Sequence, residues 1–275
     1  MEFKPYLVIK PKKGWQFIDF KELVAYRDLF YFLVSRDIKV RYKQTVLGGL
    51  WAIIQPFFMM VVFTIFFGRL AKLPSDGVPY PVFSYSALVA WGYFASAVSS
   101  SSNSVISSGG LISKVYFPRL IAPLTPVLSG LLDFAIAFVI LIVMMLWYHI
   151  YPTITTLLLP LLVILMMLTA AGVGMILAPL CAKYGDFKFT VPFLIQFWMF
   201  ASPVVYPASM LPEKYHLIYA LNPMAGVIEG FRSALLGTVA FPTQMLLIST
   251  VVSLSLFIIG ALYFRQTERY FADII

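Results

Sequence analysis

Long apolar runs without charge alternate with short charged segments along this chain. They extend over residues 44–68, 77–113, 134–182, 189–212 and 233–264. Each run exceeds the roughly 20 residues that a helix needs to cross a hydrocarbon layer of about 30 Å. The third run is long enough for two crossings, and the polar, helix-breaking sequence from Tyr148 to Pro152 interrupts it. We therefore divide it there into two spans.

The pattern predicts an all-α integral membrane protein with six transmembrane helices. The predicted spans are Val46–Gly68, Phe83–Val105, Ile121–Trp147, Ile154–Leu180, Phe189–Tyr206 and Gln244–Phe264. They form a transmembrane domain over residues 46–264, preceded by an N-terminal segment, 1–45, and followed by a short tail, 265–275. An even number of crossings places both ends of the chain on the same side of the membrane.

Composition excludes a soluble protein. Hydrophobic residues make up 61% of the chain and charged residues 12%, whereas soluble domains contain about 45–50% and about 25%. Sixteen of the twenty Lys and Arg residues fall in segments on the predicted side of the termini, and ten of them precede the first span. Short basic loops stay in the cytoplasm, so we expect a multi-pass protein of the inner (plasma) membrane with both termini cytoplasmic. The net charge of +8 then reflects topology and contact with anionic lipid rather than nucleic-acid binding.

A helical period precedes the first span. Leu23, Tyr26, Phe30, Leu33 and Val34 share one face, and charged residues share the other. Asp19 and Glu22 have the spacing of a capping box that would begin this helix. We expect an amphipathic helix at the inner membrane surface. A solvated cytoplasmic helix is the alternative.

The segment from Pro207 to Pro242 is too apolar for a free outer loop. Its pattern predicts two short helices that are separated at Asn222 and Pro223. Such helices can re-enter the bilayer where protein or a cavity satisfies their backbone.

Several residues inside the spans are unusual for a lipid environment. Ala170, Gly174 and Ala178 form a small-residue stripe that indicates close helix packing. The serines of 96–108 could line a channel or bond between helices, and the sequence leaves both open. Asp133 is an acid well inside a span, which makes it a candidate for function. Because that span is longer than necessary, Asp133 can also reach the inner interface and pair with an Arg or Lys.

Motifs of enzymes and metal sites are absent from the sequence: both histidines lie in predicted outer segments, and the only cysteine is Cys181. No Lys is followed by Ser or Thr, so the chain lacks the end of a phosphate-binding loop. We expect no enzyme activity, no metal and no cofactor in this chain. If ATP drives the protein, another subunit hydrolyses it.

Aromatic residues form 17% of the chain. Much of this fits lipid-facing surface and interfacial belts. The alternative is a pore wall, where flat rings stack on sugars. The candidates for that substrate pathway are Trp51, Phe57, Phe193, Phe197, Trp198 and Tyr206.

Four groups of residues carry a family resemblance. They are the sequence from Arg36 to Gly48 running into Leu50-Trp51 and Gln55-Pro56, the sequence from Gly110 to Arg119, the sequence from Ser202 to Pro207, and Leu221-Asn222-Pro223 followed by Phe231-Arg232. In this order and spacing the chain resembles the membrane subunit of ABC-type polysaccharide exporters, which move O-antigen or teichoic acid.

The resemblance implies a homodimer with a pore between the protomers and two copies of a separate ATPase subunit. The implied cargo is a polysaccharide on a polyprenyl diphosphate carrier. The resemblance also implies that the inner loop contacts the ATPase, through Leu111, Lys114, Tyr116 and Arg119. It implies an outer gate in the segment that contains Asn222, Pro223, Glu229 and Arg232.

The basic cluster of Arg36, Lys39, Arg41 and Lys43 could attract the carrier diphosphate, or simply anchor the inner side. An ion-coupled secondary transporter or flippase that acts without an ATPase is the alternative function.

Overall fold

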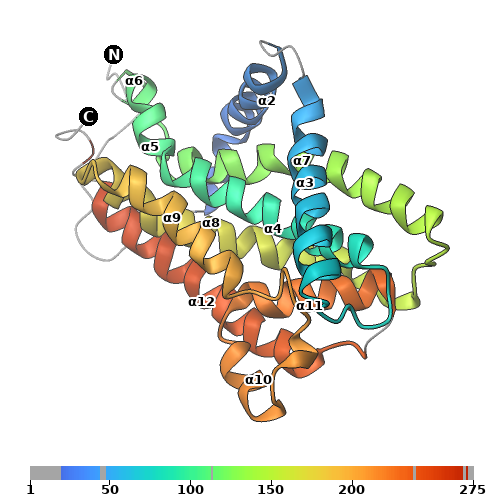
Figure 1. Cartoon of the computed structure of the whole chain (residues 1–275). Coiled ribbons are helices and arrows are strands. Elements are labelled where there is room, and N and C mark those ends of the chain that lie inside the picture. Colours follow the sequence, from blue (N-terminus) through green and yellow to red (C-terminus); the bar gives the residue numbers. More distant parts are fainter. Residues whose placement is uncertain (1–19, 44–47, 113, 238–239, 269–270, 272–275) are drawn as a thin grey trace, which may run out of the picture.

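A computed structural model describes residues 20–43, 48–112, 114–237, 240–268 and 271. Within these residues all regular elements are helical (Figure 1). The N-terminal part contains α1 (Phe20–Ala25), α2 (Arg27–Lys43), η1 (Gly48–Leu50), α3 (Trp51–Phe63), η2 (Thr64–Leu70), α4 (Tyr80–Ser102), α5 (Ser104–Ser107) and α6 (Gly109–Ile112). The remainder contains α7 (Ile121–Trp147), η3 (Ile154–Leu158), α8 (Leu159–Lys183), α9 (Phe187–Phe200), η4 (Ala208–Met210), α10 (Glu213–Tyr219), α11 (Pro223–Leu236) and α12 (Thr243–Thr267).

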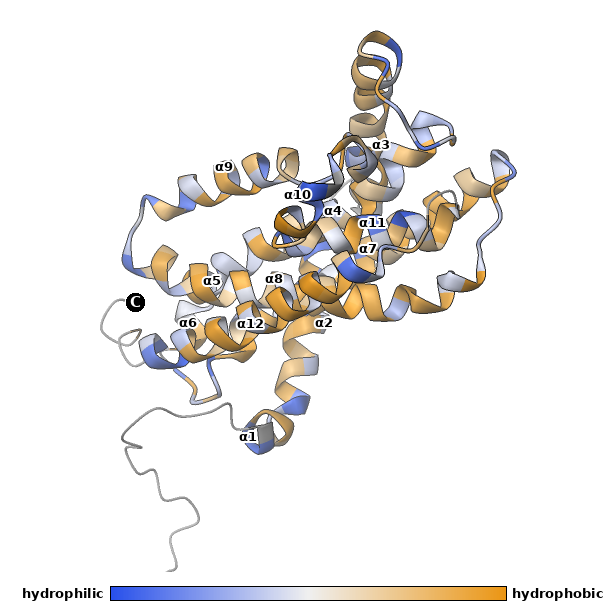
Figure 2. Ribbon diagram, turned by 90° about the horizontal axis from the view of Figure 1, so that it is seen from below, coloured by the Kyte–Doolittle hydropathy of each residue, from blue (hydrophilic) through white to orange (hydrophobic). Residues whose placement is uncertain are grey.

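Five segments of the described chain are long and apolar enough to cross a membrane. They are Trp51–Leu70, Tyr80–Ser102, Ile121–Trp147, Ile154–Lys183 and Thr243–Thr267. Hydrophobic residues cover most of α7, α8 and α12 (Figure 2). The predicted fifth span, Phe189–Tyr206, differs, because its helix ends at Phe200 and has 14 residues. At 1.5 Å per residue this helix is about 21 Å long, so the six-span count remains a prediction.

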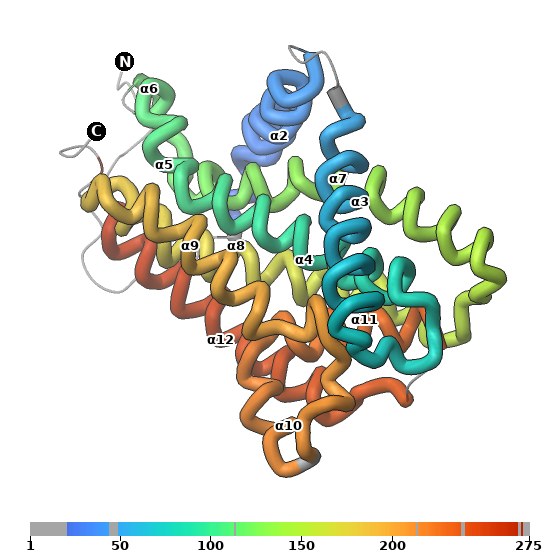
Figure 3. The backbone as a smooth tube through the Cα atoms, viewed as in Figure 1, coloured from blue at the N-terminus to red at the C-terminus, as the bar shows by residue number. Residues whose placement is uncertain are grey.

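The helix α4 lies at the centre of the bundle, where it packs against α3, α7, α8, α9 and α11 (Figure 3). Most of its side chains are buried, whereas few of those of α3 are. The helix α8, which contacts α4, also packs along α12. This contact is a backbone approach, because a β-carbon on Gly172 would lie 2.6 Å from the carbonyl carbon of Leu256. The core therefore consists of buried residues from α4, α7, α8, α11 and α12, with α3 and α9 mostly at its surface.

The small-residue stripe of α8 serves helix packing, as predicted. Ala170, Gly174 and Ala178 are buried, and a β-carbon on Gly174 would collide with the side chain of Ser101 from α4. The Ser101 hydroxyl in turn donates to the carbonyl of Pro123 at 2.8 Å. This serine bonds between helices, which is one of the two alternatives for the Ser-rich segment.

The predicted N-terminal helix is present as α1 and α2, separated by a turn at Tyr26. Leu33 on α2 packs with Phe117 and Ile121, and Leu23, Tyr26 and Phe30 adjoin the same cluster. Its apolar face thus covers the segment that precedes α7, and its position at the membrane surface stays a prediction. Asp19 of the predicted capping box lies outside the described residues.

The segment between the last two apolar helices folds as two short helices, as the sequence predicted. The first, α10, ends at Tyr219, and α11 begins at Pro223. The Asn222 side chain caps α11 by accepting from the backbone N–H of Met224 at 3.1 Å. Every residue of α11 is buried, packed against α4, α8 and α12.

Candidate functional site

A cavity of about 750 Å³ lies between the surface helices and the core. It is bordered by α3, α4, α7 and α9, and by the last turn of α2. The lining is mixed. The cavity is lined by aromatic rings, side-chain amides, hydroxyls and aliphatic residues. The aromatic residues are Tyr42, Trp51, Trp91, Tyr93 and Phe134, the amides are Gln55 and Gln196, and the hydroxyls are Ser96, Ser99 and Ser100. Amides and hydroxyls can bond to a polar ligand, and aromatic faces can stack on it.

A charged group borders this cavity. Arg41 forms an ion pair with Asp133 of α7, and the Tyr42 hydroxyl donates to the other oxygen of the same carboxylate. Burial raises the pKa of Tyr42, and the hydrogen bond to Asp133 adds to this effect, so the phenol stays protonated as a donor. The expectation that Asp133 pairs with a basic residue is confirmed, and its place at the inner side of the membrane stays a prediction.

Of the four basic residues proposed to attract a diphosphate, Arg41 lines the cavity. Arg36 pairs with the adjacent Asp37 at 3.0 Å. Lys39 and Lys43 are exposed on α2. The cluster is therefore spread along the helix, with one member at the cavity wall.

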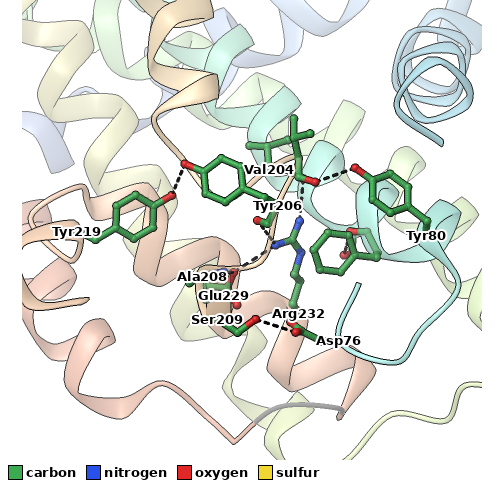
Figure 4. A network of polar contacts seen from close by, with 12 residues as sticks. Asp76, Tyr80, Val204, Tyr206, Ala208, Ser209, Tyr219, Glu229 and Arg232 are labelled. Atoms are coloured by element: carbon green, nitrogen blue, oxygen red, sulfur yellow. Dashed lines mark hydrogen bonds and ion pairs between the residues drawn. The ribbon is translucent and has the colours of Figure 1, made fainter. Parts of the chain in front are cut away.

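A second polar network clamps the loop after α9 to α11 (Figure 4). The guanidinium of Arg232 donates to Glu229 at 3.2 Å and to the carbonyl oxygens of Val204 at 2.8 Å and Tyr206 at 3.4 Å. Glu229 accepts from the backbone N–H of Ala208 at 2.9 Å. Both side chains are almost fully buried. The Arg–Glu pair of α11 thus fixes residues 204–208.

Aromatic residues extend this network. The Arg232 guanidinium lies 3.7 Å from the centre of the Phe83 ring, a cation–π contact. The Tyr80 hydroxyl donates to the carbonyl of Val205 at 2.7 Å, and the hydroxyls of Tyr206 and Tyr219 lie 3.1 Å apart. The network therefore connects α4, α10 and α11 through the loop after α9.

Trp198 and Asn222, which sequence reasoning placed in a pore wall and a gate, contact each other. The indole N–H of Trp198 donates to the Asn222 side-chain oxygen at 2.9 Å. The Asn222 amide donates to the carbonyl of Ala201 at 3.0 Å and to the hydroxyl of Ser202 at 2.9 Å. The Trp198 ring also packs edge-on against Phe94. These two residues join the end of α9 to the start of α11.

The other pore candidates divide between cavity and surface. Trp51 lines the cavity. Phe193 and Phe197 are 68% and 66% exposed on α9, and Phe57 is exposed on α3. The cavity side of α9 is formed instead by Pro192, Ile195, Gln196 and Met199. Sequence reasoning missed Gln55 and Gln196, although an amide in an apolar run was a visible signal.

The loop of Leu111, Lys114, Tyr116 and Arg119 contacts both ends of the described chain. The Tyr116 hydroxyl donates to Glu22 of α1 at 3.1 Å. Arg119 donates to the carbonyl of Glu268, just after α12. Lys114, Val115 and Tyr116 are exposed, and together with Ile112, Phe117 and Arg119 they line a hollow of about 200 Å³. The loop is therefore held by its contacts with Glu22 and Glu268, while Lys114, Val115 and Tyr116 stay exposed on its surface.

Comparisons of the sequence with known proteins show which family the chain belongs to. The family model for ABC-2 type transporters matches residues 28–236. The O-antigen export system permease protein RfbA of Klebsiella pneumoniae is 28% identical over 90% of this chain and 95% of its own, and its namesake from Myxococcus xanthus is 27% identical over 92% and 97%. The polysialic acid transport protein KpsM of Escherichia coli is 25% identical over 86% and 92%. The family match covers most of the chain, so this protein belongs to the ABC-2 type transporter family.

Proposed function

We propose that the chain is the channel-forming membrane subunit of an ATP-driven exporter that moves a polyprenyl diphosphate-linked polysaccharide across the inner membrane. The observation that carries this proposal is the similarity, over 86–92% of the chain, to O-antigen export permeases and a polysialic acid transport protein. The cavity supports it, because its aromatic, amide and hydroxyl lining suits a sugar better than a purely apolar lipid tail.

The proposal includes a homodimer, two copies of a separate ATPase subunit, and six spans with both termini cytoplasmic. In this topology α9 is the fifth span. Residues 201–207, which Arg232 holds by hydrogen bonds, complete the passage of the chain across the membrane. The exposed aromatic residues of α3 and α9 would then face the second protomer rather than lipid. Co-purification of the chain with its associated subunits, followed by ATPase assay with and without lipid-linked glycan, tests the assembly as a whole.

The alternative, an ion-coupled carrier that acts alone, finds less support. Such a carrier needs an acid that is free to exchange its ion. Asp133 instead accepts hydrogen bonds from both Arg41 and Tyr42. Glycan transport by the purified chain without any ATPase would nevertheless favour this alternative and reject the proposal.

The exposed face of the inner loop is the proposed docking surface for the ATPase. We expect the double variant Lys114→Glu, Val115→Asp to reduce the co-purified ATPase subunit at least about tenfold, because mismatched charge at an interface costs several kcal/mol. Membrane insertion and thermal stability should stay unchanged, since both side chains are exposed. Lys214→Glu is the matched control, because Lys214 is exposed on α10, at the other end of the molecule from α6 (Figure 1). Undiminished co-purification would remove this loop from the interface.

The exposed rings of α9 are the proposed pore wall. We expect Phe193→Leu combined with Phe197→Leu to lower glycan export about tenfold, because each lost ring contact removes a stacking interaction of about 0.5–1.5 kcal/mol. The surface stays apolar, so a lipid-facing role predicts normal export. Tyr263→Leu is the control, since Tyr263 is also exposed but lies on α12, which the proposal leaves outside the pore wall. Export would be compared at equal protein level in membrane vesicles that contain the ATPase subunit.

A further inference from the structure

The ion pair at the cavity wall is formed and is still partly accessible. Arg41 and Asp133 neutralise each other inside the molecule, yet their side chains keep 32% and 26% of their surface exposed. Both residues line the cavity. A molecule in the cavity therefore reaches the pair directly.

The chemistry of the pair favours exchange with a stronger anion. A guanidinium presents a planar set of donors that matches phosphate as well as carboxylate, and phosphate can accept two of them in parallel. A diphosphate also carries more negative charge than the Asp133 carboxylate. Tyr42 provides the second requirement for exchange, because it bonds to the oxygen of Asp133 that Arg41 does not contact. Asp133 therefore retains a hydrogen-bond donor when Arg41 leaves it.

We propose that Arg41 and Asp133 form an exchangeable counter-ion site, in which the phosphate or diphosphate group of a ligand in the cavity replaces the Asp133 carboxylate on Arg41. Asp133 occupies the anion position while the site is empty, and it stays bonded to Tyr42 when the ligand is present. This deepens the proposed function, on which the identity of the ligand as a lipid carrier rests.

The surroundings of the site fit an amphiphilic phosphate. Trp51, Pro56, Met59 and other apolar residues line the same cavity, so an apolar tail can lie in it together with the head group. Lys39 and Lys43 are exposed on the same helix as Arg41 and attract anions towards it. Asp133 sets the selectivity, since a neutral ligand gains nothing by displacing it.

The exchange predicts opposite effects for the two members of the pair. The protein would be purified with its ATPase partner in phosphatidylcholine nanodiscs, and polyprenyl diphosphate would be titrated in the absence of ATP. We expect Asp133→Asn to strengthen binding about tenfold and Arg41→Gln to weaken it by a similar factor. In the double variant the Asp133 substitution should add nothing to the loss caused by Arg41→Gln. Lys39→Gln is the control for general attraction and should weaken binding no more than about fivefold.

A purely structural ion pair predicts changes in the same direction for both variants. Unchanged or weaker binding by Asp133→Asn would therefore overturn the exchange. If that variant does not fold, Tyr42→Phe replaces it: loss of the phenol leaves Asp133 dependent on Arg41, so binding should weaken severalfold. Unchanged binding by Tyr42→Phe would overturn the exchange equally.

Further ligands identify the source of the phosphate. Uncharged polyprenol should bind without sensitivity to either substitution. Competition by inorganic pyrophosphate assigns recognition to the phosphate group alone, whereas competition by phosphatidylglycerol would show a general site for anionic lipid and overturn the carrier assignment. Because no ATP is present, the assay does not depend on hydrolysis. Failure of ATP-driven export would reject the proposed function and leave these binding results standing.

Discussion

Gly260→Val is expected to prevent the chain from accumulating as a folded protein. A β-carbon on Gly260 would collide with the carbonyl oxygen of Gly172, and a β-carbon on Gly172 would lie 2.6 Å from the carbonyl carbon of Leu256. These neighbours are backbone atoms of α8 and α12, which cannot move aside as a flexible side chain can. The two helices would have to separate, and small residues are what allow helices in a membrane to approach this closely.

We expect a loss of at least about 3 kcal/mol, at the upper end of overpacking effects, because the obstruction is backbone. Yield in membranes and thermal unfolding in detergent would measure it. Gly92→Val is the matched control, since Gly92 also lies in a long apolar helix and a β-carbon there meets nothing within 4 Å. Equal unfolding temperatures for Gly260→Val and the unmodified chain would contradict the described backbone contact.

Arg232→Met is expected to destabilise the protein by about 3–5 kcal/mol, because removing one member of a buried ion pair leaves the other charge uncompensated. Glu229 would lose its guanidinium partner, and the carbonyl oxygens of Val204 and Tyr206 would lose their donor. We also expect faster proteolysis within residues 201–210, since that loop is held through these bonds.

The double variant Glu229→Gln, Arg232→Met separates charge from packing. It removes both charges and keeps an acceptor for the N–H of Ala208, so it should recover part of the stability lost in Arg232→Met. Lys214→Met serves as the control for loss of a positive charge at an exposed position. Thermal unfolding and limited proteolysis of all four proteins would test this. A double variant no more stable than Arg232→Met would show that the uncompensated carboxylate is not the cause.

The sequence predicted those features of the fold that depend on one segment at a time. The run Ile121–Trp147 forms a helix with these bounds, because apolar residues dominate it from end to end and Asp133 is its one charged residue. The stripe of Ala170, Gly174 and Ala178 predicted close packing, since small residues act through their own size. The helix boundary at Asn222 and Pro223 was visible because it depends on local backbone chemistry.

Features that depend on several segments could not be predicted. The absence of charge over residues 189–212 gave no sign that the helix would end at Phe200, because uncharged residues suit a helix and a buried loop equally. The spacing of Glu229 and Arg232 was readable, yet their partners at Val204 and Ala208 lie in a distant loop. Aromatic residues were ambiguous for a related reason: a ring that faces lipid and a ring that faces a cavity produce the same pattern.

The uneven burial of the helices has a consequence for how this protein evolves. Gly172 and Gly260 have no room for a side chain, so the contact between α8 and α12 restricts these two positions to glycine. The surface of α3 and α9 is largely exposed within the protomer, and exposed positions usually change with little effect on stability. Mutations can therefore accumulate around the cavity without endangering the fold. Related proteins can therefore differ in the molecules that enter the cavity while they keep the same packing of α8 and α12.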